Sequence, residues 1–384
     1  MMTFRTIPNE GHPLKLVLVG VGGMGQAWLA AIQDCAEVEL VGLVDLNTAA
    51  AEQVAGDLDP GIAIGTDIVE VAARSRAQAV IDVTVPSAHH PVTTAALFAG
   101  LPVLGEKPVA SSVAQGLSLV AAAQITGELF MVSQSRRYNQ QLWDFKEQIS
   151  ALGPVGVLTT EFFKAPHFGG FRDDMDHPLL LDMAVHQLDM ARFLMQEEPV
   201  SVYCEEYNPG WSWYRGDAGS TAIFQMASGG RYIFSGTWCS PGLETSWNGA
   251  WRASTEHGSA RWNGDDDPEI QDTRTSPAGT KVIDHHTGRT GDGLPGEGIA
   301  GSLREFVDAL RSGNQPMGAV ESNISSLAMV EAAIESAATG ARVLLAESMS
   351  AALSQAVETE RREDVAQMLR SWQTAGGGRG KGHR

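Results

Sequence analysis

Three side chains in the middle of the sequence are suited to moving protons. Lys107 lies in Glu106-Lys107-Pro108, just after the short apolar run Leu101–Leu104. A lysine at the end of a buried strand can donate to a substrate hydroxyl oxygen, or lose its own proton when it is desolvated. Asp182 and His186 are four residues apart in a helix-compatible segment, so a helix would place the carboxylate and the imidazole on one face.

These groups fit the chemistry of alcohol oxidation. The hydroxyl proton must be removed as hydride leaves the carbon, and an imidazole that titrates near neutral pH suits that task. We expect Glu106 to position the ammonium of Lys107, and Asp189, which shares a helix face with His186, to orient the imidazole. The alternatives are a surface lysine at a turn and an ion pair on a helix surface.

A glycine-rich turn lies near the start of the chain. Gly20-Val21-Gly22-Gly23-Met24-Gly25 has G-x-G-x-x-G spacing, follows the apolar run Leu14–Val19, and precedes a helix-compatible run from Gln26 to Gln33. Glycine lets the backbone approach a pyrophosphate closely, and the following helix would direct its N-terminus at it. The pattern predicts a dinucleotide site, with a glycine turn in an unrelated α/β protein as the alternative.

An acidic residue follows at the expected distance. Asp45 ends the apolar run Leu40–Val44, twenty positions after Gly25. Its carboxylate would accept hydrogen bonds from ribose hydroxyls and repel a 2′-phosphate. The next residues, Leu46-Asn47-Thr48, offer no cation to receive that phosphate. We therefore expect NAD rather than NADP.

Composition narrows the class of protein. The chain of 384 residues is long enough for two domains, and its formal charge of −19 disfavours binding to nucleic acid or to an anionic membrane. Its three cysteines, Cys35, Cys204 and Cys239, are far apart and do not indicate a disulfide framework. Met1–Pro13 lacks the apolar core of a signal peptide, and no apolar run is long enough to span a membrane. We expect a cytoplasmic protein.

Two kinds of pattern divide the chain. From residue 14 to about 130, short apolar runs alternate with helical stretches, which is typical of a doubly wound parallel sheet. After about residue 150 the strands alternate apolar and polar residues, which predicts a mostly antiparallel sheet with one open face. We expect one helix near Pro178–Met195 to interrupt this sheet. Three more are predicted near Ala300–Ser312, Asn323–Ala338 and Ser350–Trp372.

These patterns give the expected domain boundaries. We assign residues 1–13 to a lead-in, 14–135 to a Rossmann domain, 136–345 to a substrate-binding and oligomerisation domain, 346–375 to a helical extension, and 376–384 to a disordered tail. Residues 263–297 are polar and predict a surface excursion. Asp284-His285-His286 lies there, and we interpret it as solvated rather than as a metal site.

Several cationic and aromatic residues are candidates for contact with a substrate. Arg137 and Tyr138 follow an apolar run at the carboxyl edge of the first sheet, where a structural role for the arginine is the alternative. Lys164, His167 and Arg172 lie in a segment before Asp182 that would close over a substrate or remain a solvated loop. A further cluster comprises Trp211, Trp213 and Tyr214, which suit either sugar stacking or a subunit contact.

Together these motifs resemble the Gfo/Idh/MocA family of oxidoreductases. Val83-Thr84-Val85-Pro86 with His90 is similar to the family's P-x-x-x-H segment, and Gly105-Glu106-Lys107-Pro108 to its E-K-P motif. Asp182 and His186 match its D-x-x-x-H motif, and Asp182 follows Lys107 by 75 positions. Two features depart from the pattern. The usual glycine-rich lead-in to the Asp is here His177–Leu181, and the helix after about residue 350 is an extension.

The resemblance implies a fold and an activity. The fold would be an N-terminal Rossmann domain and a C-terminal α+β domain whose open sheet forms a homodimer or homotetramer. The activity would be NAD-dependent hydride transfer from a sugar or polyol carbon. Lys107 and His186 would be the proton-handling pair, either of which would take the proton, and Asp182 would bind substrate hydroxyls. The implied cofactor contacts are Gly20, Gly22, Gly23, Met24, Gly25, Asp45, Thr84, Pro86, His90, Glu106 and Lys107.

Two other functions remain open. A glycoside-processing member would oxidise a ring hydroxyl transiently, eliminate the aglycone and release no net NADH. A sensor or regulator would bind the dinucleotide without chemistry. The presence of Lys107, Asp182 and His186 together favours an enzyme over a binder, because a protein that only binds has no need of all three.

Overall fold

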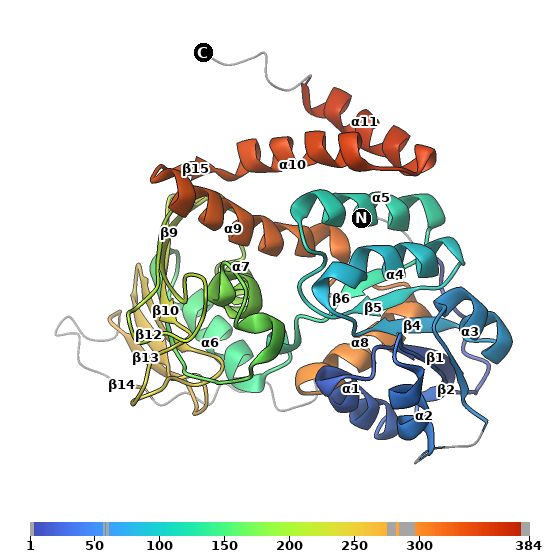
Figure 1. The fold of residues 1–384 in the computed structure, drawn as a ribbon. Coiled ribbons are helices and arrows are strands. Elements are labelled where there is room, and N and C mark those ends of the chain that lie inside the picture. The colour runs from blue at the N-terminus through green and yellow to red at the C-terminus, as the bar shows by residue number, and fades with distance from the viewer. Residues whose placement is uncertain (1–3, 57, 59–60, 275–281, 284–295, 378–384) are drawn as a thin grey trace. The chain divides into compact units, whose positions relative to one another are not determined.

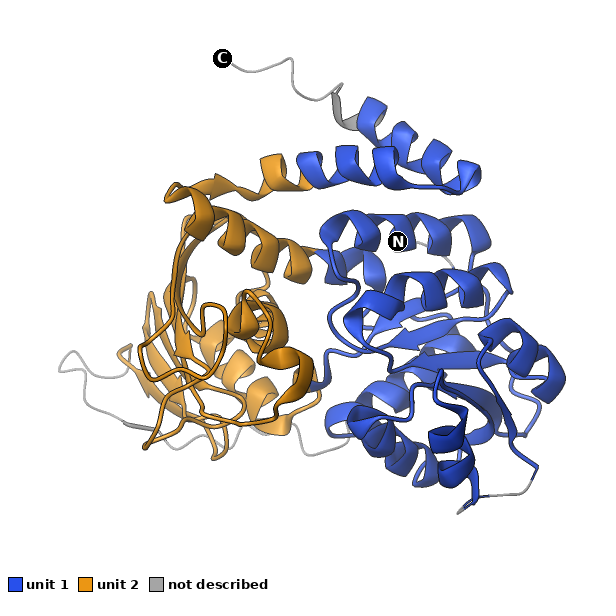
Figure 2. Ribbon diagram, in the orientation of Figure 1, with its two compact units in different colours: residues 1–135, 295–324, 350–384 blue, residues 136–294, 325–349 orange. Residues whose placement is uncertain are grey.

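The computed structural model describes residues 4–56, 58, 61–274, 282–283 and 296–377. The chain forms two compact units (Figure 2). Unit 1 comprises residues 1–135, 295–324 and 350–384, and unit 2 comprises residues 136–294 and 325–349. Asp284-His285-His286 and most of the polar excursion lie outside the described residues, as does the end of the tail from residue 378.

Unit 1 is built on a parallel sheet. Its six strands have the order β3-β2-β1-β4-β5-β6, and every neighbouring pair is parallel. Apolar runs without alternation form the central strands because both faces of the sheet are covered. The strands are β1 Leu14–Val19, β2 Val38–Val44, β3 Ala63–Gly65, β4 Ala79–Asp82, β5 Val103–Gly105 and β6 Phe130–Val132.

Helices lie on both faces of this sheet. Figure 1 shows α4 and α5 on one face and α1 and α8 on the other. Helix α8 joins unit 1 although it is distant in sequence, because it packs against α1. The helices are α1 Gly23–Gln33, α2 Thr48–Gly56, α3 Ile68–Ser75, α4 Pro86–Phe98, α5 Val113–Thr126 and α8 Gly298–Ser312. This is the doubly wound Rossmann arrangement that the sequence predicts.

Unit 2 is built on a larger, mostly antiparallel sheet. Its nine described strands have the order β14-β13-β12-β11-β7-β10-β9-β8-β15, and only β7 and β10 pair in parallel. The strands are β7 Val155–Phe163, β8 Pro199–Tyr207, β9 Gly219–Met226, β10 Arg231–Thr237, β11 Ala250–Thr255, β12 Gly258–Trp262, β13 Glu269–Asp272, β14 Val282–Ile283 and β15 Val343–Leu344. The α/β class with one parallel and one mostly antiparallel sheet is therefore confirmed.

One face of this second sheet is covered by helices. Helix α6 (Gln140–Ala151) packs on β12, and α7 (Val185–Met195) packs on β7 and β10. Helix α9 (Val320–Thr339) starts in unit 1 and continues into unit 2, where Ser336 accepts a hydrogen bond from the backbone N–H of Cys204 at 2.9 Å. In β9 and β10 buried residues alternate with residues that are partly or fully exposed, as expected for a sheet with one open face.

Two predicted helices differ in the structure. The segment predicted as one helix over Pro178–Met195 is a π-helix over Leu179–Ala184 followed by α7. The single helix predicted over Ser350–Trp372 is wrong, because α10 (Leu345–Thr359) and α11 (Glu363–Gly377) are separate. Glu360 accepts hydrogen bonds from the backbone N–H groups of Arg361 and Arg362, both at 2.8 Å, and this turn replaces the helical pattern. Among the described residues, no helix has the length and hydropathy that a membrane span requires.

Candidate active site

The glycine turn between β1 and α1 leaves room for an anion. An added Cβ would lie 2.6 Å from the carbonyl oxygen of Val83 at Gly20 and 2.2 Å from that of Gly20 at Gly25, so both glycines are needed for the turn itself. At Gly22 and Gly23 an added Cβ would meet nothing within 4 Å. Gly22 is the N-cap residue of α1, and it has no side chain that could accept hydrogen bonds from the first N–H groups of the helix. These N–H groups are therefore open to a ligand. This cradle fits a dinucleotide pyrophosphate.

Asp45 lies at the carboxyl end of β2 and is tied to the glycine turn. Its Oδ2 accepts the backbone N–H of Val21 at 2.9 Å, and its Oδ1 accepts that of Asn47 at 2.8 Å. A carboxylate has about four lone-pair positions, so two remain for ribose hydroxyls. Leu46 beside it is 90% exposed and carries no charge. The geometry agrees with a ribose site, and the described residues that follow Asp45 directly, Leu46-Asn47-Thr48, carry no cation for a 2′-phosphate.

The Glu106-Lys107-Pro108 turn at the end of β5 is fixed by hydrogen bonds. Glu106 Oε1 accepts the indole N–H of Trp28 at 2.8 Å, and its Oε2 accepts the backbone N–H of Lys107 at 3.1 Å. The peptide bond before Pro108 is cis. These two contacts of Glu106 hold the backbone of the turn, and the role expected for it, positioning the ammonium of Lys107, stays a prediction. Because Trp28 lies on α1, the lysine turn is linked to the helix that starts at the glycine turn.

Of two adjacent histidines on α4, the first contacts this turn. The ring of His89 is buried, with Nδ1 2.8 Å from the carbonyl oxygen of Pro108 and Nε2 3.0 Å from that of Thr84. The P-x-x-x-H pattern predicts that His90 is the histidine of this segment that belongs to the site. Successive residues on a helix point about 100° apart, however, so His89 and His90 cannot both face the turn. His89 is a residue of the candidate site that the motif did not indicate.

His90 instead faces the C-terminal extension. Its Nε2 lies 2.9 Å from Ser118 Oγ on α5, and this hydroxyl donates to the carboxylate of Glu360. Burial lowers the pKa of His90, and the nearby Glu360 opposes that effect. The structure therefore does not bring His90 to the lysine turn. It links this histidine, through the hydroxyl of Ser118, to Glu360 in the segment between α10 and α11.

Asp82, at the end of β4, is a buried carboxylate that sequence patterns did not single out. Its Oδ1 accepts the hydroxyl of Thr84 at 2.7 Å and its Oδ2 that of Thr93 at 3.0 Å. Burial raises the pKa of Asp82, while nearby His89 and these hydrogen bonds oppose the rise. The Thr84 side chain is thus engaged within the turn before α4, where it fixes the backbone that leads to Pro86.

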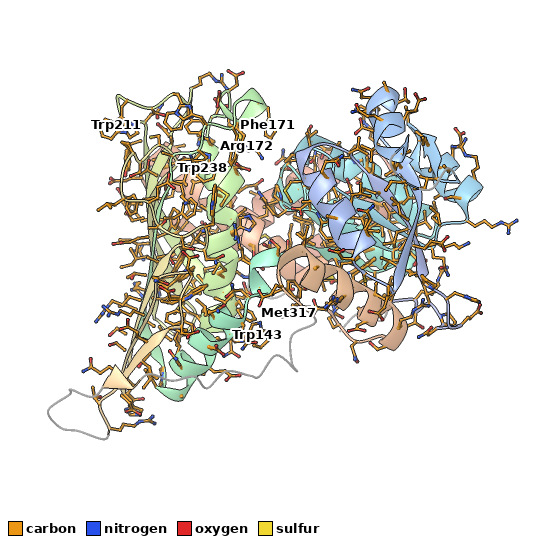
Figure 3. All side chains as sticks on the ribbon, turned by 90° about the horizontal axis from the view of Figure 1, so that it is seen from below. Trp143, Phe171, Arg172, Trp211, Trp238 and Met317 are labelled. Carbon is orange, nitrogen blue, oxygen red and sulfur yellow. The ribbon has the colours of Figure 1, made fainter. Side chains whose placement is uncertain are left out.

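In unit 2, Asp182 lies in the π-helix and His186 in the first turn of α7, where it is buried. Arg172 Nε donates to Asp182 Oδ2 at 2.8 Å. The Arg172 guanidinium also lies over two phenyl rings, 5.5 Å from the centroid of Phe168 and 4.8 Å from that of Phe171. Figure 3 shows Phe171 and Arg172 near one end of unit 2, with Trp143 well away from them. Single-turn π segments are frequent at functional sites.

Other predicted substrate contacts are engaged within unit 2. Arg137 forms a buried two-point ion pair with Asp189, at 2.7 and 2.8 Å, and this pair supports the structural role given as the alternative for the arginine. Tyr138 is buried. Lys164 pairs with Glu244 at 2.8 Å, and His167 stacks on Trp213 with ring centroids 3.5 Å apart. Arg172 contacts Asp182 directly, through the hydrogen bond described above.

Comparison with known proteins identifies the family. Residues 14–134 match the model of the oxidoreductase family with an NAD-binding Rossmann fold, and residues 151–261 match the model of the GFO/IDH/MocA C-terminal domain. The chain belongs to the Gfo/Idh/MocA family. It is therefore an oxidoreductase-family protein with an NAD-binding Rossmann domain, as the motifs predict.

Its relatives include sugar and polyol dehydrogenases. The chain is 27% identical over 373 residues to the uncharacterized protein y4oX of Sinorhizobium fredii, covering 87% of this chain and 96% of that protein. It is 30% identical to inositol 2-dehydrogenase of Rhodococcus erythropolis over 50% of this chain and 56% of that enzyme. An oxidoreductase from Agrobacterium radiobacter, solved with NAD+, L-tartaric acid and magnesium, superimposes with a TM-score of 0.77 at 19% identity, covering 87% and 99% of the two chains. This last likeness shows the fold.

Proposed function

We propose that this protein is an NAD-dependent dehydrogenase that removes hydride from a hydroxyl-bearing carbon of a sugar or polyol. The observation that carries the proposal is the link from Trp28 through Glu106 to the backbone of Lys107, at 2.8 and 3.1 Å. It ties the lysine turn to the helix of the glycine cradle. NAD would accept the hydride at C4 of its nicotinamide.

The residues of unit 1 would bind the cofactor. The open N–H groups around Gly22 and Gly23 would hold the pyrophosphate, and Asp45 would accept the ribose hydroxyls with its remaining lone pairs. His89 and Thr84 would shape the backbone beside the nicotinamide, a role that we assign to His89 rather than His90 because of the contact with Pro108.

The proton and the substrate would be handled by three side chains. Asp182, held by Arg172, would accept hydrogen bonds from substrate hydroxyls. As the C–H electron pair leaves as hydride, the hydroxyl proton would pass to Lys107 or His186, leaving a carbonyl product. Placing these groups around one hydroxyl would lower the barrier by orientation and proton transfer.

The test is turnover of NAD with a panel of neutral and acidic sugars and polyols. We expect NADH formation with at least one of them, and its loss in Lys107→Ala and His186→Ala while NAD still binds. The variant whose remaining activity no longer follows the wild-type pH profile identifies the proton acceptor. Consumption of a glycoside without net NADH would instead indicate redox-assisted elimination. Tight NAD binding with no consumption of any substrate would contradict the proposal.

We also propose self-association through the open face of the second sheet. The side chains of Tyr203, Ile223 and Ile233 lie in register across β8, β9 and β10 on the face away from the helices. An apolar row on an uncovered sheet face supports an interface between subunits. Sedimentation should show a homodimer or homotetramer that Ile223→Glu dissociates, and a monomeric wild-type protein would contradict this.

A further inference from the structure

Aromatic rings gather at the same end of unit 2 as Arg172. Trp238 is 0% exposed and stacks on Phe162, with ring centroids 5.6 Å apart. Phe168 and Trp247 pack against Trp238 at 6.3 and 5.9 Å, and against one another at 6.3 Å with an interplanar angle of 24°. We call Phe168, Trp238 and Trp247 the aromatic platform. Phe168 is 59% exposed and Trp247 39%, so a buried ring supports two that reach solvent.

Backbone hydrogen bonds hold the strands and loops that carry the platform. Lys164 N–H donates to the carbonyl oxygen of Thr237 at 3.0 Å, and its own carbonyl oxygen accepts from Ser240 at 2.9 Å. Thr245 N–H donates to the carbonyl oxygen of Phe163 at 3.0 Å. A ligand would therefore meet rings whose supporting backbone is already ordered, which reduces the entropy cost of binding.

A charged pair borders the platform. The ammonium of Lys164 lies 4.7 Å from the ring centroid of Trp247 and 2.8 Å from Glu244 Oε2. Glu244 Oε1 accepts the N–H of Ala165 at 3.0 Å, and the hydrogen bond from Lys164 lowers the pKa of Glu244. A flat apolar surface beside a donor and an acceptor is complementary to a ring that has an apolar face and a polar edge.

The platform is continuous with the candidate substrate site. The Arg172 guanidinium lies 5.5 Å from the ring centroid of Phe168, and its Nε is 2.8 Å from Asp182 Oδ2. Figure 3 shows Arg172, Phe171 and Trp238 close to one end of unit 2. One guanidinium therefore separates the platform from the carboxylate proposed to bind the reacting sugar.

We propose that the aromatic platform is a subsite for a second ring of the substrate, so that the protein acts on glycosides in preference to single-ring sugars. This inference rests on the proposed function. The hydroxyls of the first ring bind Asp182, and the face of the second ring packs on Phe168 and Trp247. The shared chemistry is a flat ring with an apolar face, which either a sugar unit or an aryl aglycone supplies.

The experiment compares substrates with one and two rings. In the NAD-loaded wild type, kcat/KM is measured for glucose and myo-inositol, for cellobiose, and for phenyl β-glucoside, following both NADH and substrate consumption. We expect the better two-ring substrate to exceed the single-ring ones at least fivefold. Trp247→Ala should reduce kcat/KM for that substrate by about five- to tenfold more than for single rings, which corresponds to the loss of one aromatic contact. The ranking of cellobiose against phenyl β-glucoside tells which ring the subsite takes.

A matched control is Leu243→Ala, since Leu243 is 100% exposed and has no ring. It should leave the ratio of two-ring to one-ring kcat/KM unchanged. Saturation-transfer NMR of cellobiose and phenyl β-glucoside on the NAD-bound protein reports binding without turnover, and Trp247→Ala should reduce the signal of the second ring.

The outcomes separate the two proposals. Equal kcat/KM for one and two rings, with no selective loss in Trp247→Ala, would overturn the subsite and leave the dehydrogenase proposal intact. If no sugar is consumed, the dehydrogenase proposal fails and the NMR signal alone decides the subsite. A sedimentation change on Trp247→Ala would assign the platform to a contact between copies of the chain and would also overturn the subsite.

Discussion

Arg172, the last residue of a short 3₁₀ helix (Gly170–Arg172), donates from Nε to Oδ2 of Asp182 in the π-helix at 2.8 Å. The arginine side chain is 29% exposed and the carboxylate 11%, so solvent screens this pair only in part. The guanidinium also lies over the rings of Phe168 and Phe171. The orientation of the Asp182 carboxylate therefore depends on a residue ten positions earlier as well as on its own helix.

The first prediction concerns this pair. Arg172→Gln should lower kcat/KM by about tenfold or more, because a charge-assisted hydrogen bond that orients Asp182 is lost. Arg172→Lys should recover only part of the loss, since an ammonium keeps the charge but not the planar fork. Steady-state kinetics with the best sugar of the panel measures both.

Arg215→Gln is the control for removal of a charge from the same region. Arg215 pairs with Asp176 at 2.9 Å, but both side chains are more than half exposed, so its loss should change kcat/KM less than twofold. Equal activity of Arg172→Gln and the wild type would remove Arg172 from the positioning of Asp182.

The second prediction separates two glycines of the turn. Gly22→Ala should fold normally, because its added Cβ meets nothing within 4 Å and Gly22 has a negative φ of −66°. It should nevertheless weaken NAD binding severalfold, since the methyl group points into the space proposed for the pyrophosphate. Gly25→Ala should destabilise the protein, because its Cβ would lie 2.2 Å from the carbonyl oxygen of Gly20. Thermal unfolding with and without NAD distinguishes the two effects. Unchanged NAD affinity in Gly22→Ala would contradict the assignment of the cradle.

The parts of the site that are contiguous in sequence could be predicted. The glycine turn and Asp45 follow from runs and spacings within about thirty residues, because a parallel strand, a tight turn and a helix are local features. The doubly wound sheet follows for the same reason, since its buried strands are continuous apolar runs between helices. Lys107 and the pair Asp182 and His186 are candidates by residue type and spacing, but a surface lysine and a surface ion pair would show the same pattern, so their assignment depends on the order in which the motifs occur.

Contacts between distant residues could not be predicted. Nothing local to Asp189 indicates that it pairs with Arg137, 52 positions away. Whether His89 or His90 contacts the lysine turn depends on the rotation of α4 relative to β5. Two adjacent histidines in the sequence do not show this rotation. The π-helix also has a different periodicity from an α-helix. Asp182 lies within it, so the four-residue spacing to His186 does not by itself place the two side chains on one helix face. Each of these outcomes is decided by packing rather than by local pattern.

The third prediction concerns the link between α1 and the lysine turn. Trp28→Phe removes the indole donor and leaves an oxygen of buried Glu106 without this partner, so the free energy of unfolding should fall by about 1–3 kcal/mol. Because Glu106 also holds the N–H of Lys107, kcat should fall as well. Urea unfolding and steady-state kinetics measure the two effects.

A matched control is Trp143→Phe in unit 2. The Trp143 indole N–H donates to the backbone carbonyl of Arg137 at 2.8 Å, so this variant also loses one indole hydrogen bond. It should lower stability without changing NAD affinity. If both variants affect stability and kcat alike, Trp28 has no particular role in positioning Lys107.

The fourth prediction concerns the contact of His90 with Ser118 and Glu360. Burial lowers the pKa of His90 below its ordinary value of 6.5, although Glu360 opposes the shift. The unfolded chain therefore binds the proton more readily than the folded one. This contribution to stability is complete above pH 6.5 and is lost as the pH falls from there toward the lower folded pKa. His90→Gln keeps a donor for Ser118 but cannot titrate, so its melting temperature should fall less between pH 7.5 and 5.5 than that of the wild type.

The comparison isolates His90 because the other titrating groups remain in both proteins. One of them acts in the opposite direction, since the hydrogen bond to Glu206 raises the pKa of His177 and its stabilisation is lost as the pH rises. His257→Gln serves as a control, because the His257 side chain is 38% exposed and its Nε2 lies 3.8 Å from the solvent-exposed carboxylate of Glu256. If the melting temperatures of the wild type and of His90→Gln change equally with pH, the prediction is wrong. The segment between α10 and α11 would then be held on α5 without a proton-dependent contribution from His90.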